Sequence, residues 1–373
     1  MSEITKELII TTHQKDVQIA FLEDKRLVEL HREKSSDQFS VGDIYLGKVR
    51  RLHAGLRAAF VDIGAEKDAF LHYSDLGSKV KTINEFVAQA IAKKRRSITN
   101  FPSEPTITKT GEINEVLSTG QLLLVQIAKE AISTKGPRVT TEISFAGRYV
   151  VLVPFGDKIS ISQKIKNNEE RNRLKKIVQG IKPRNFGIII RTVAKDKNVE
   201  EIEADLKQLV RKWNSAIANL PQAKPPSKIV DELDKTSVLI RDFVNETFHA
   251  IHIDSPTLYQ EVKNYINSFS ENRQKSDIVK LYKGSSPIFE YFNVAKQIKS
   301  SFGKVVTLKN GIYLIIEHTE AMHVIDVNSG NRMRKSDKEE STLEINIEAA
   351  AEIARQLRLR DMGGLIVIDF IDL

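Results

Sequence analysis

The hydrophobic pattern near the end of the chain predicts a strand, a helix and a second strand. Apolar runs occupy residues 322–325 and 365–368, and each reads as a strand that ends in a polar residue. Between them, apolar residues recur at helical spacing until Gly363 and Gly364 end the helix. The apolar stripe that we expect to pack inward is formed by Ile347, Ala350, Ala351, Ala354 and Leu357.

Polar residues follow both apolar runs. Asp326 ends the first run, Asn328 comes two residues later, and Asp369 ends the second run. A strand–helix–strand crossover makes two parallel strands whose carboxyl ends meet at one edge, where open α/β sheets carry their sites. We therefore expect both aspartates and Asn328 to converge in space. The alternative is that these strand-end aspartates cap helices or form turns.

Two converging carboxylates repel each other unless a cation lies between them. Oxygen ligands in a chain without cysteine favour a hard ion, Mg²⁺ or Mn²⁺. Such an ion polarises a phosphoryl oxygen and generates hydroxide from bound water. The pattern therefore points to phosphate chemistry at this edge.

Short strands dominate the first part of the chain. Runs at 8–11, 17–22 and 27–30 precede strands at 43–49, 56–63, 68–71 and 121–127, and the glycine turns of this second group indicate a small β-barrel. The long insertion at 78–112, with its basic run at 93–96, is predicted to be a mobile loop. The apolar periodicity of residues 198–220 predicts an amphipathic helix that buries Trp213. The proline-rich composition of residues 221–228 predicts a linker.

Charge and composition narrow the function. The 373 residues carry a net charge of +8, which favours a polyanionic partner and nucleic acid first; the alternative is a merely basic enzyme. The absence of cysteine excludes disulfides and thiolate metal sites. No apolar run approaches the ~20 residues of a membrane helix, so we expect no membrane segment. The first residues lack a signal-peptide pattern, and we therefore expect a cytoplasmic protein.

Two stretches in the predicted strand–helix–strand region read HVIDVNSG and NIEAAAEIARQLRLRDMGGLIVIDFIDL. They resemble the catalytic segment of the ribonuclease E/G family of bacterial endoribonucleases. Upstream, VGDIYLGKV, AAFVDIG and AFLHYSDL resemble an S1 domain, and TKG, TTEIS, RYVVLVP and GIIIRT resemble the family's 5′-sensor region. The resemblance extends from about residue 5 to residue 373.

This resemblance implies an α+β multidomain fold. An RNase H-like subdomain would be split between residues 1–36 and 237–300, with an S1 (OB-fold) β-barrel inserted at 37–140. A 5′-sensor region with a linker would occupy 141–236, and an incomplete DNase I-like α/β catalytic region 301–373.

The resemblance also assigns the catalytic positions. Asp326 and Asp369 would hold Mg²⁺, with Mn²⁺ as a possible substitute, and Asn328 would orient the site. Asp372 also belongs to the motif, but we do not expect it to be a ligand.

Further residues are implied to bind RNA. Phe60 and Phe70 of the barrel would stack on bases and Lys135 would contact adjacent RNA; the alternative for both phenylalanines is burial in the core. The 5′-monophosphate pocket would be formed by Gly136, Val151, Arg191 and Thr192. Where relatives often have consecutive basic residues, this chain has Gln163 and Lys164, which weakens any arginine-dependent contact there.

The implied function is Mg²⁺-dependent endonucleolytic hydrolysis of single-stranded, A/U-rich RNA, preferring 5′-monophosphorylated ends, in ribosomal RNA processing and messenger RNA decay. The chain ends before the family's CPxCxG zinc link and small dimerising domain, so we expect a fragment without zinc. A homodimer is expected for the full-length protein only. The alternatives are an RNA-binding protein that does not cut and a structural partner in an RNA-decay assembly.

Overall fold

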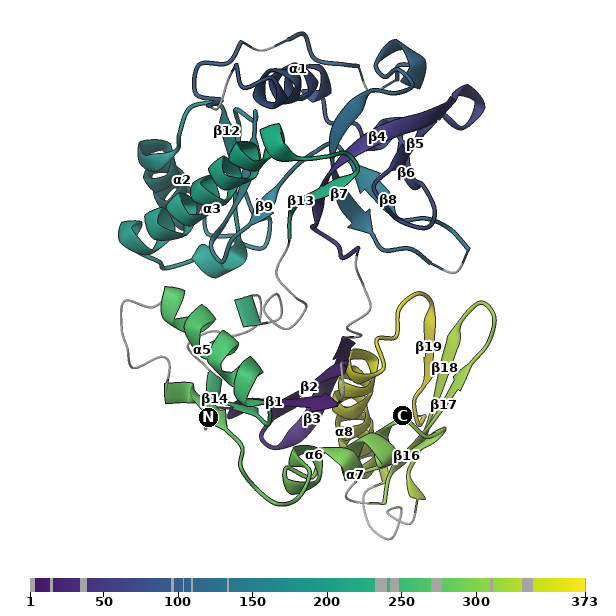
Figure 1. The fold of residues 1–373 in the computed structure, drawn as a ribbon. Coiled ribbons are helices and arrows are strands. Elements are labelled where there is room, and N and C mark those ends of the chain that lie inside the picture. Colours follow the sequence, from purple (N-terminus) through teal and green to yellow (C-terminus); the bar gives the residue numbers. More distant parts are fainter. Residues whose placement is uncertain are drawn as a thin grey trace. The chain divides into compact units, whose positions relative to one another are not determined.

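The computed structural model describes residues 4–13, 16–33, 39–94, 97–102, 104–108, 110–132, 134–231, 240–241, 248–269, 277–308, 311–330 and 338–372. The chain forms two compact units (Figure 1). The inserted unit is Ser36–Asp234, and the split unit combines Met1–Ser35 with Lys235–Leu373. No helix among these described ranges is long and apolar enough to span a bilayer.

A closed five-stranded barrel forms the first part of the inserted unit. Its strands, in spatial order, are β4 (Ile44–His53), β5 (Ala58–Asp62), β6 (Ala69–His72), β8 (Arg138–Thr140) and β7 (Leu122–Lys129). The barrel closes because β7 also pairs with β4. Alternate residues point inward, so that Val49, Val61 and Leu71 are buried in its core. The small β-barrel predicted from the strand pattern is confirmed.

The proline-rich segment predicted as a linker is partly a strand. Residues Ser227–Val230 form β13, which pairs antiparallel with the first half of β4. Lys228 also forms an ion pair of 2.8 Å with Asp43, whose side chain is buried. The linker prediction, which covered 221–228, is therefore wrong for Ser227 and Lys228, because pairing with β4 lies outside what local composition encodes.

The insertion predicted as a mobile loop contains a helix, α1 (Val80–Ile91). Its apolar face, which includes Val80, Ile83, Phe86 and Val87, is buried. Phe86 lies 6.2 Å from Trp213, ring centroid to ring centroid, so α1 packs into the second core of the unit. The mobile-loop prediction is wrong here, because the basic and proline-rich residues after the helix masked its apolar periodicity; Arg95 and Arg96 lie outside the described residues.

That second core is covered by a four-stranded sheet and two helices. The sheet order is β11 (Ile159–Ile161), β12 (Phe186–Ile190), β10 (Val150–Pro154) and β9 (Phe145–Ala146). The helices are α2 (Asn168–Ile181) and α3 (Val199–Asn219), and α3 begins with a capping box between Asn198 and Glu201. Trp213 of α3 is only 2% exposed, so the prediction that it belongs to the core is confirmed.

In the split unit, the N-terminal strands share a sheet with a segment that follows more than 200 residues later. The order is β15 (Val279–Leu281), β14 (Phe248–Ile253), β1 (Lys6–His13), β2 (Asp16–Glu23) and β3 (Arg26–Glu33). Strands β1 and β14 are parallel, and Asp254, just past β14, binds the hydroxyl of Thr11 and the N–H of Thr12. Helices α5 (Pro256–Phe269), α6 (Ile288–Tyr291) and α7 (Val294–Ser301) belong to the same unit.

A second sheet of the split unit contains the predicted strand–helix–strand. Its order is β16 (Val305–Thr307), β17 (Tyr313–His318), β18 (His323–Asn328) and β19 (Ile366–Asp369). Strands β18 and β19 are parallel, and α8 (Lys338–Leu359) connects them, as the pattern predicted.

The inserted unit also contains short 3₁₀ turns. They are Ala54–Leu56, Tyr73–Asp75, Ile113–Glu115, Thr192–Ala194 and Leu220–Gln222.

Helix α8 packs between the two sheets of this unit (Figure 1). Its inward face carries Ile345, Ala349 and Ile353 toward β17 and β18, and Leu359 toward β2 and β3. The stripe predicted to face inward is instead largely exposed, with Ile347 at 62% and the three alanines also exposed. That prediction is wrong because the true inward face includes polar residues, which hydrophobic periodicity does not count.

The polar part of the inward face is organised around Glu352, which is 5% exposed. Its carboxylate accepts hydrogen bonds from Arg26 of β3 (2.7 Å), Arg355 and Gln356 (2.9 Å), and Arg355 also donates to the carbonyl of Leu27. Burial opposes ionisation of Glu352, but these donors and the two arginine charges outweigh it and hold its pKa below the ordinary value. Glu352 thus ties α8 to the first sheet as an ion pair.

We expect Glu352→Gln to lower the free energy of unfolding of the split unit by about 3–5 kcal/mol, because removing one partner of a buried ion pair leaves the other charge uncompensated. Urea denaturation followed by far-UV circular dichroism measures this loss. Since the lowered pKa makes the ionised carboxylate the stabilising form, its contribution is present above the pKa of an unfolded Glu and disappears as the pH falls through the folded pKa. The difference between wild type and variant should therefore shrink in acid.

The matched control is Glu261→Gln, which removes an exposed carboxylate from α5 of the same unit. Fluorescence of Trp213, the only tryptophan of the chain, reports on the inserted unit and should keep its midpoint in both variants. Equal urea midpoints for wild type and Glu352→Gln at neutral pH would show that the ion pair contributes nothing to stability.

Candidate functional site

The two aspartates that end the parallel strands are direct neighbours. Asp326 of β18 and Asp369 of β19 are register partners, so their side chains leave the same face of the sheet. Asp326 is half-buried and Asp369 is exposed. The convergence predicted from the sequence is confirmed, and it follows from the parallel crossover through α8.

Asn328 completes this group. Its Nδ2 donates a 2.8 Å hydrogen bond to Oδ2 of Asp326. An asparagine amide donates only through its nitrogen, so the bond fixes which way the Asn328 side chain is turned. The bond also occupies one oxygen of Asp326 and fixes the orientation of that carboxylate.

The three side chains lie on the face of the sheet opposite α8. Strand alternation buries Leu314, Ile316, Ile325 and Val327 against the helix. The register partners of the site residues on β17 are Ile315, opposite Asp326, and Tyr313, opposite Asn328. We call this the open face; it presents carboxylate, amide and partly exposed apolar groups together.

The donor set is compatible with a hard divalent ion. Within the described part of the chain, no group of three or more His, Cys, Asp or Glu side chains is arranged to hold a metal. Mg²⁺, however, is commonly bound by one or two carboxylates while it keeps several water ligands for exchange with phosphate oxygens. The adjacent carboxylates of Asp326 and Asp369 fit that binding mode and do not fit a closed protein cage.

The loop after Asn328 approaches another turn closely. Gly330 has a φ of +58°, and a Cβ placed on it would lie 2.2 Å from the carbonyl oxygen of Gly311. Gly311 lies two residues before β17, so this contact holds the chain that leaves the site against the segment that enters the neighbouring strand. Only glycine fits both the backbone conformation and the available space.

On the barrel, Phe60 and Phe70 form a pair outside the core. They are register partners on β5 and β6, with ring centroids 5.8 Å apart in an edge-to-face arrangement. Both are half-buried, whereas their strand neighbours Ala59 and Leu71 are fully buried. The core alternative is therefore not supported, and both rings lie on the outer surface of the barrel.

Two further residues extend this aromatic pair, and sequence reasoning missed them. The guanidinium of Arg51 lies 4.1 Å from the ring centroid of its register partner Phe60. The His72 ring stacks on Phe70 at 6.4 Å, and its Nδ1 accepts the N–H of Ser74. Arg51, Phe60, Phe70 and His72 form what we call the barrel row. The cross-strand register, which the sequence does not state, brings Arg51, Phe60 and Phe70 together, and His72 lies two residues after Phe70 on the same strand.

Lys135 and Gly136 lie at the edge of the same barrel. Lys135 is exposed, and the backbone of Gly136 packs against the carbonyl of Asp68, where a Cβ would approach to 2.3 Å. The next residue, Pro137, accepts the N–H of Phe70. The structure therefore groups Gly136 with the barrel row.

Three of the four predicted sensor residues lie in the second sheet of the inserted unit or directly after one of its strands. Val151 of β10 is paired with Ile189 of β12, and Arg191 and Thr192 follow the end of β12. The hydroxyl of Thr192 lies 2.9 Å from that of Ser162, and Arg191 donates to the carbonyl of Gly147 at 2.7 Å. The glycine in contact with Arg191 is thus Gly147, and its only sequence signal is its place in the AGRYVVLVP segment.

A buried carboxylate supports this corner. Asp205 of α3 accepts the N–H groups of Arg148, Tyr149 and Val150 at 2.7–3.1 Å. Burial raises the pKa of Asp205, while the three backbone donors and the charge of Arg191 act in the opposite direction. The carboxylate therefore holds the turn between Gly147 and β10 in place behind Arg191.

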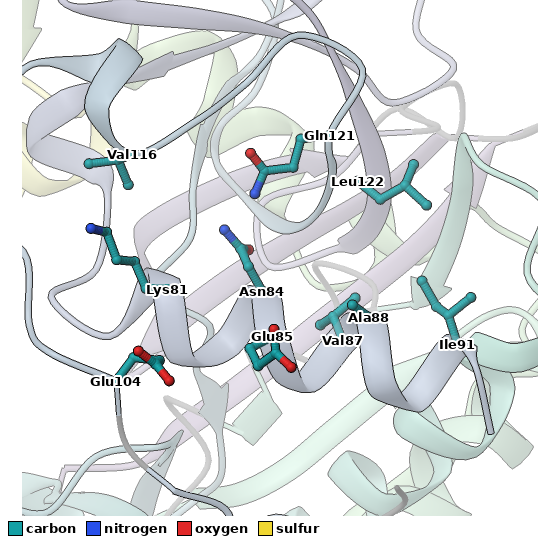
Figure 2. A pocket seen from close by; sticks show the side chains of 10 residues that line it. All are labelled: Lys81, Asn84, Glu85, Val87, Ala88, Ile91, Glu104, Val116, Gln121 and Leu122. Carbon is teal, nitrogen blue, oxygen red and sulfur yellow. The ribbon is translucent and has the colours of Figure 1, made fainter. Parts of the chain in front are cut away.

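The inserted unit also has a pocket of about 690 Å³ between α1 and the start of β7 (Figure 2). Its polar lining includes Lys81, Asn84 and Glu85 of α1 and Gln121, with Asn84 pointing toward Gln121. None of the residues predicted to bind metal, RNA or phosphate lines it. The candidate site is therefore the open face of the sheet.

Comparison with known proteins gives a consistent result. The family model described as Ribonuclease E/G family matches residues 144–373. The chain is 37% identical to "Ribonuclease G" of Haemophilus influenzae over 98% of its own length and 71% of that protein, and 33% identical to "Ribonuclease G" of Escherichia coli K12 over 99% and 72%. It is also 37% identical to "Ribonuclease E" of a Nostoc species, over 98% of this chain and 49% of that protein.

We expect Gly330→Ala to lower the free energy of unfolding of the split unit by at least ~2 kcal/mol, because a Cβ is strained at positive φ and collides with backbone. Urea denaturation measures the loss, and hydrogen exchange should show faster exchange of the amides around Gly311. Gly363→Ala is the matched control, since a Cβ at Gly363 meets nothing within 4 Å. Equal stability of the two alanine variants would refute the close approach.

Proposed function

This chain belongs to the ribonuclease E/G family and is an endoribonuclease, a hydrolase that acts in RNA processing, and we propose that it cuts single-stranded, A/U-rich RNA with Mg²⁺ as cofactor. The products would carry a 5′-phosphate and a 3′-hydroxyl. We place this activity in the cytoplasm, in ribosomal RNA processing and messenger RNA decay. The observation that carries the proposal is the register pairing of Asp326 with Asp369 beside Asn328.

In this proposal Asp326 and Asp369 hold the ion, and Mn²⁺ could replace Mg²⁺. When bound, the ion supplies a Lewis acid for the scissile phosphate and lowers the pKa of an attacking water. The role of the protein is to keep two negative charges adjacent at the end of a rigid sheet. Asn328 orients Asp326 through its Nδ2 hydrogen bond, so the carboxylate need not reorganise when RNA arrives.

The location of the site on an open face supports a polymeric substrate, because a single strand can lie across the face without threading into a cavity. Ile315 and Tyr313 border the carboxylates as register partners of Asp326 and Asn328. Both are partly exposed and offer apolar surface for the bases that flank the scissile phosphate. The chemistry thus needs an unpaired strand, since duplex bases present no ring faces to such groups.

The barrel row is proposed as the main RNA-binding surface. Base stacking on aromatic rings contributes about 1–3 kcal/mol per base and tolerates any sequence. Phe60 and Phe70 supply the rings, while Arg51 and the exposed Lys135 supply positive charge for the phosphates. The net charge of +8 adds a long-range attraction to the polyanion.

The 5′-monophosphate preference is proposed to arise at the end of β12. Arg191 offers a guanidinium and Thr192 a hydroxyl, both suited to phosphate oxygens, with Val151 beside them on the sheet. In this proposal Gly147, which contacts Arg191, takes the role that the family resemblance implied for Gly136. Gly136 is then a barrel residue next to Lys135 in the path of the RNA.

We expect Asp326→Asn and Asp369→Asn each to reduce cleavage by about 10³-fold or more, because each removes a charge needed to hold an ion that supplies several kcal/mol of stabilisation. RNA affinity should persist, since the barrel row is untouched. The assay uses a short A/U-rich RNA with Mg²⁺ or with EDTA, and a separate binding titration. Asp372→Asn is the matched control and should cleave like wild type.

Two results would contradict this assignment. Cleavage by Asp369→Asn at the wild-type rate would show that the carboxylate pair is not the metal site. Tight RNA binding by the wild-type chain without any cleavage in Mg²⁺ or Mn²⁺ would favour the alternative function, an RNA-binding protein that does not cut.

The sensor proposal predicts a substrate-dependent effect. Thr192→Val keeps the shape of the side chain and removes its hydroxyl, so it should reduce the advantage of 5′-monophosphorylated over 5′-hydroxyl RNA by roughly 10-fold, the value of one hydrogen bond to a charged group. The rate on 5′-hydroxyl RNA should stay unchanged and serves as the internal control. An unaltered ratio of the two rates would place 5′-end recognition elsewhere.

A further inference from the structure

Strand β19 carries Asp369 and is short. Among the described residues its strand partner is β18. Its pairing ends at Asp369, whose register partner is Asp326, and no register pair with β18 follows among the described residues. Contacts of the chain immediately after Asp369 therefore bear directly on its position.

The inward and outward alternation of β19 breaks at this point. Ile366 and Ile368 face the core under α8, and continued alternation would send Phe370 inward and Ile371 outward. The structure shows the reverse, with Phe370 39% exposed and Ile371 packed against the core. The chain thus leaves the strand geometry directly after Asp369, where a strand end is most free to move.

One side chain of α8 makes hydrogen bonds to the backbone just beyond β19, where the described pairing with β18 has ended. Nδ2 of Asn346 donates to the carbonyl of Ile371 at 2.8 Å, and Oδ1 of Asn346 accepts the N–H of Ile371 at 3.1 Å. An amide side chain presents a donor and an acceptor side by side, as the backbone of a partner strand does. We call this two-bond contact the Asn346 clamp.

The rest of α8 makes the clamp rigid. Asn346 follows Ile345, which is fully buried in the core beneath the sheet, and the helix is tied to the first sheet through Glu352. The clamp therefore fixes the backbone two residues beyond Asp369 to an element that is itself held on both sides. Ile347, the next residue of α8, points to solvent.

We propose that Asn346 is a positioning residue for the reaction, which holds Asp369 beside Asp326 by clamping the end of β19. This inference rests on the proposed function only through the role of Asp369. Asn346 lies on the α8 side of the sheet and acts through the backbone, without contact to substrate. Residues that orient a metal ligand from behind commonly change metal affinity or activity by about 10–100-fold when they are replaced.

The test compares Asn346→Leu, which keeps the volume and removes both hydrogen bonds, with Ile347→Ala as the matched control at the exposed neighbouring position. Three quantities are measured on the full chain: hydrogen exchange of residues 365–372, Mn²⁺ affinity by electron paramagnetic resonance, and kcat and KM on a short RNA. We expect faster exchange of the Ile371 amide, and losses of about 10–100-fold in Mn²⁺ affinity and kcat, with KM unchanged. The control should match wild type in all three.

A second variant keeps the test decisive if Asn346→Leu folds poorly. Asn346→Asp retains an acceptor for the Ile371 N–H and loses the donor to its carbonyl, so it should show smaller losses in the same three quantities. If the hydrogen-exchange rate of the Ile371 amide stays at the wild-type value in both variants, the Asn346 clamp does not exist. Faster exchange with wild-type Mn²⁺ affinity and kcat would overturn the positioning role. Absence of metal-dependent cleavage by the wild type would instead contradict the proposed function, while hydrogen exchange would still decide whether the clamp exists.

Discussion

The split unit depends on α8 being held on both of its sides. Toward the second sheet it packs Ile345, Ala349 and Ile353, an ordinary apolar contact. Toward the first sheet it buries the carboxylate of Glu352 against Arg355 and the partly exposed Arg26, and a buried charge is tolerated only when its partners are present. Because α8 is the crossover between β18 and β19, its placement determines whether those strands meet in register, and hence whether Asp326 and Asp369 become neighbours.

The same arrangement explains how the site proposed for RNA cleavage can be built without a cavity. The apolar side chains of the second sheet pack against α8. Because side chains alternate along a strand, the polar residues lie on the opposite face. The carboxylates need only a common register position to come together, and Asn328 needs only to lie two residues further along β18. A surface of this kind leaves access for an extended RNA strand and relies on the backbone for rigidity.

The inserted unit uses the register in a similar way for a different purpose. In the barrel row, Arg51, Phe60 and Phe70 occupy cross-strand positions, so charge and aromatic surface run across three strands. In the second sheet, Val151 and the residues after β12 gather at one end, held from behind by Asp205. Both surfaces consist of side chains that alternate with buried ones. One strand can therefore contribute to the core and also to a surface that is proposed to bind RNA.

The sequence by itself determined the local features of this protein: the strand–helix–strand with its two terminal aspartates, the short strands of the barrel, and the helix that buries Trp213. Each of these features follows from hydrophobic periodicity, from glycine and proline residues that end helices and strands, or from composition over a few neighbouring residues. Resemblance to a known family supplied the chemistry of these positions and was supported by the comparisons.

Only the tertiary structure decided which face of α8 turns inward, because polar residues such as Glu352 are buried there with partners from distant segments. For the same reason the sequence did not reveal that Arg51 lies over Phe60, that Gly147 meets Arg191, or that Asn346 holds the end of β19. These contacts join residues that are far apart along the chain or on different strands, and their existence depends on register and packing, which no local pattern encodes.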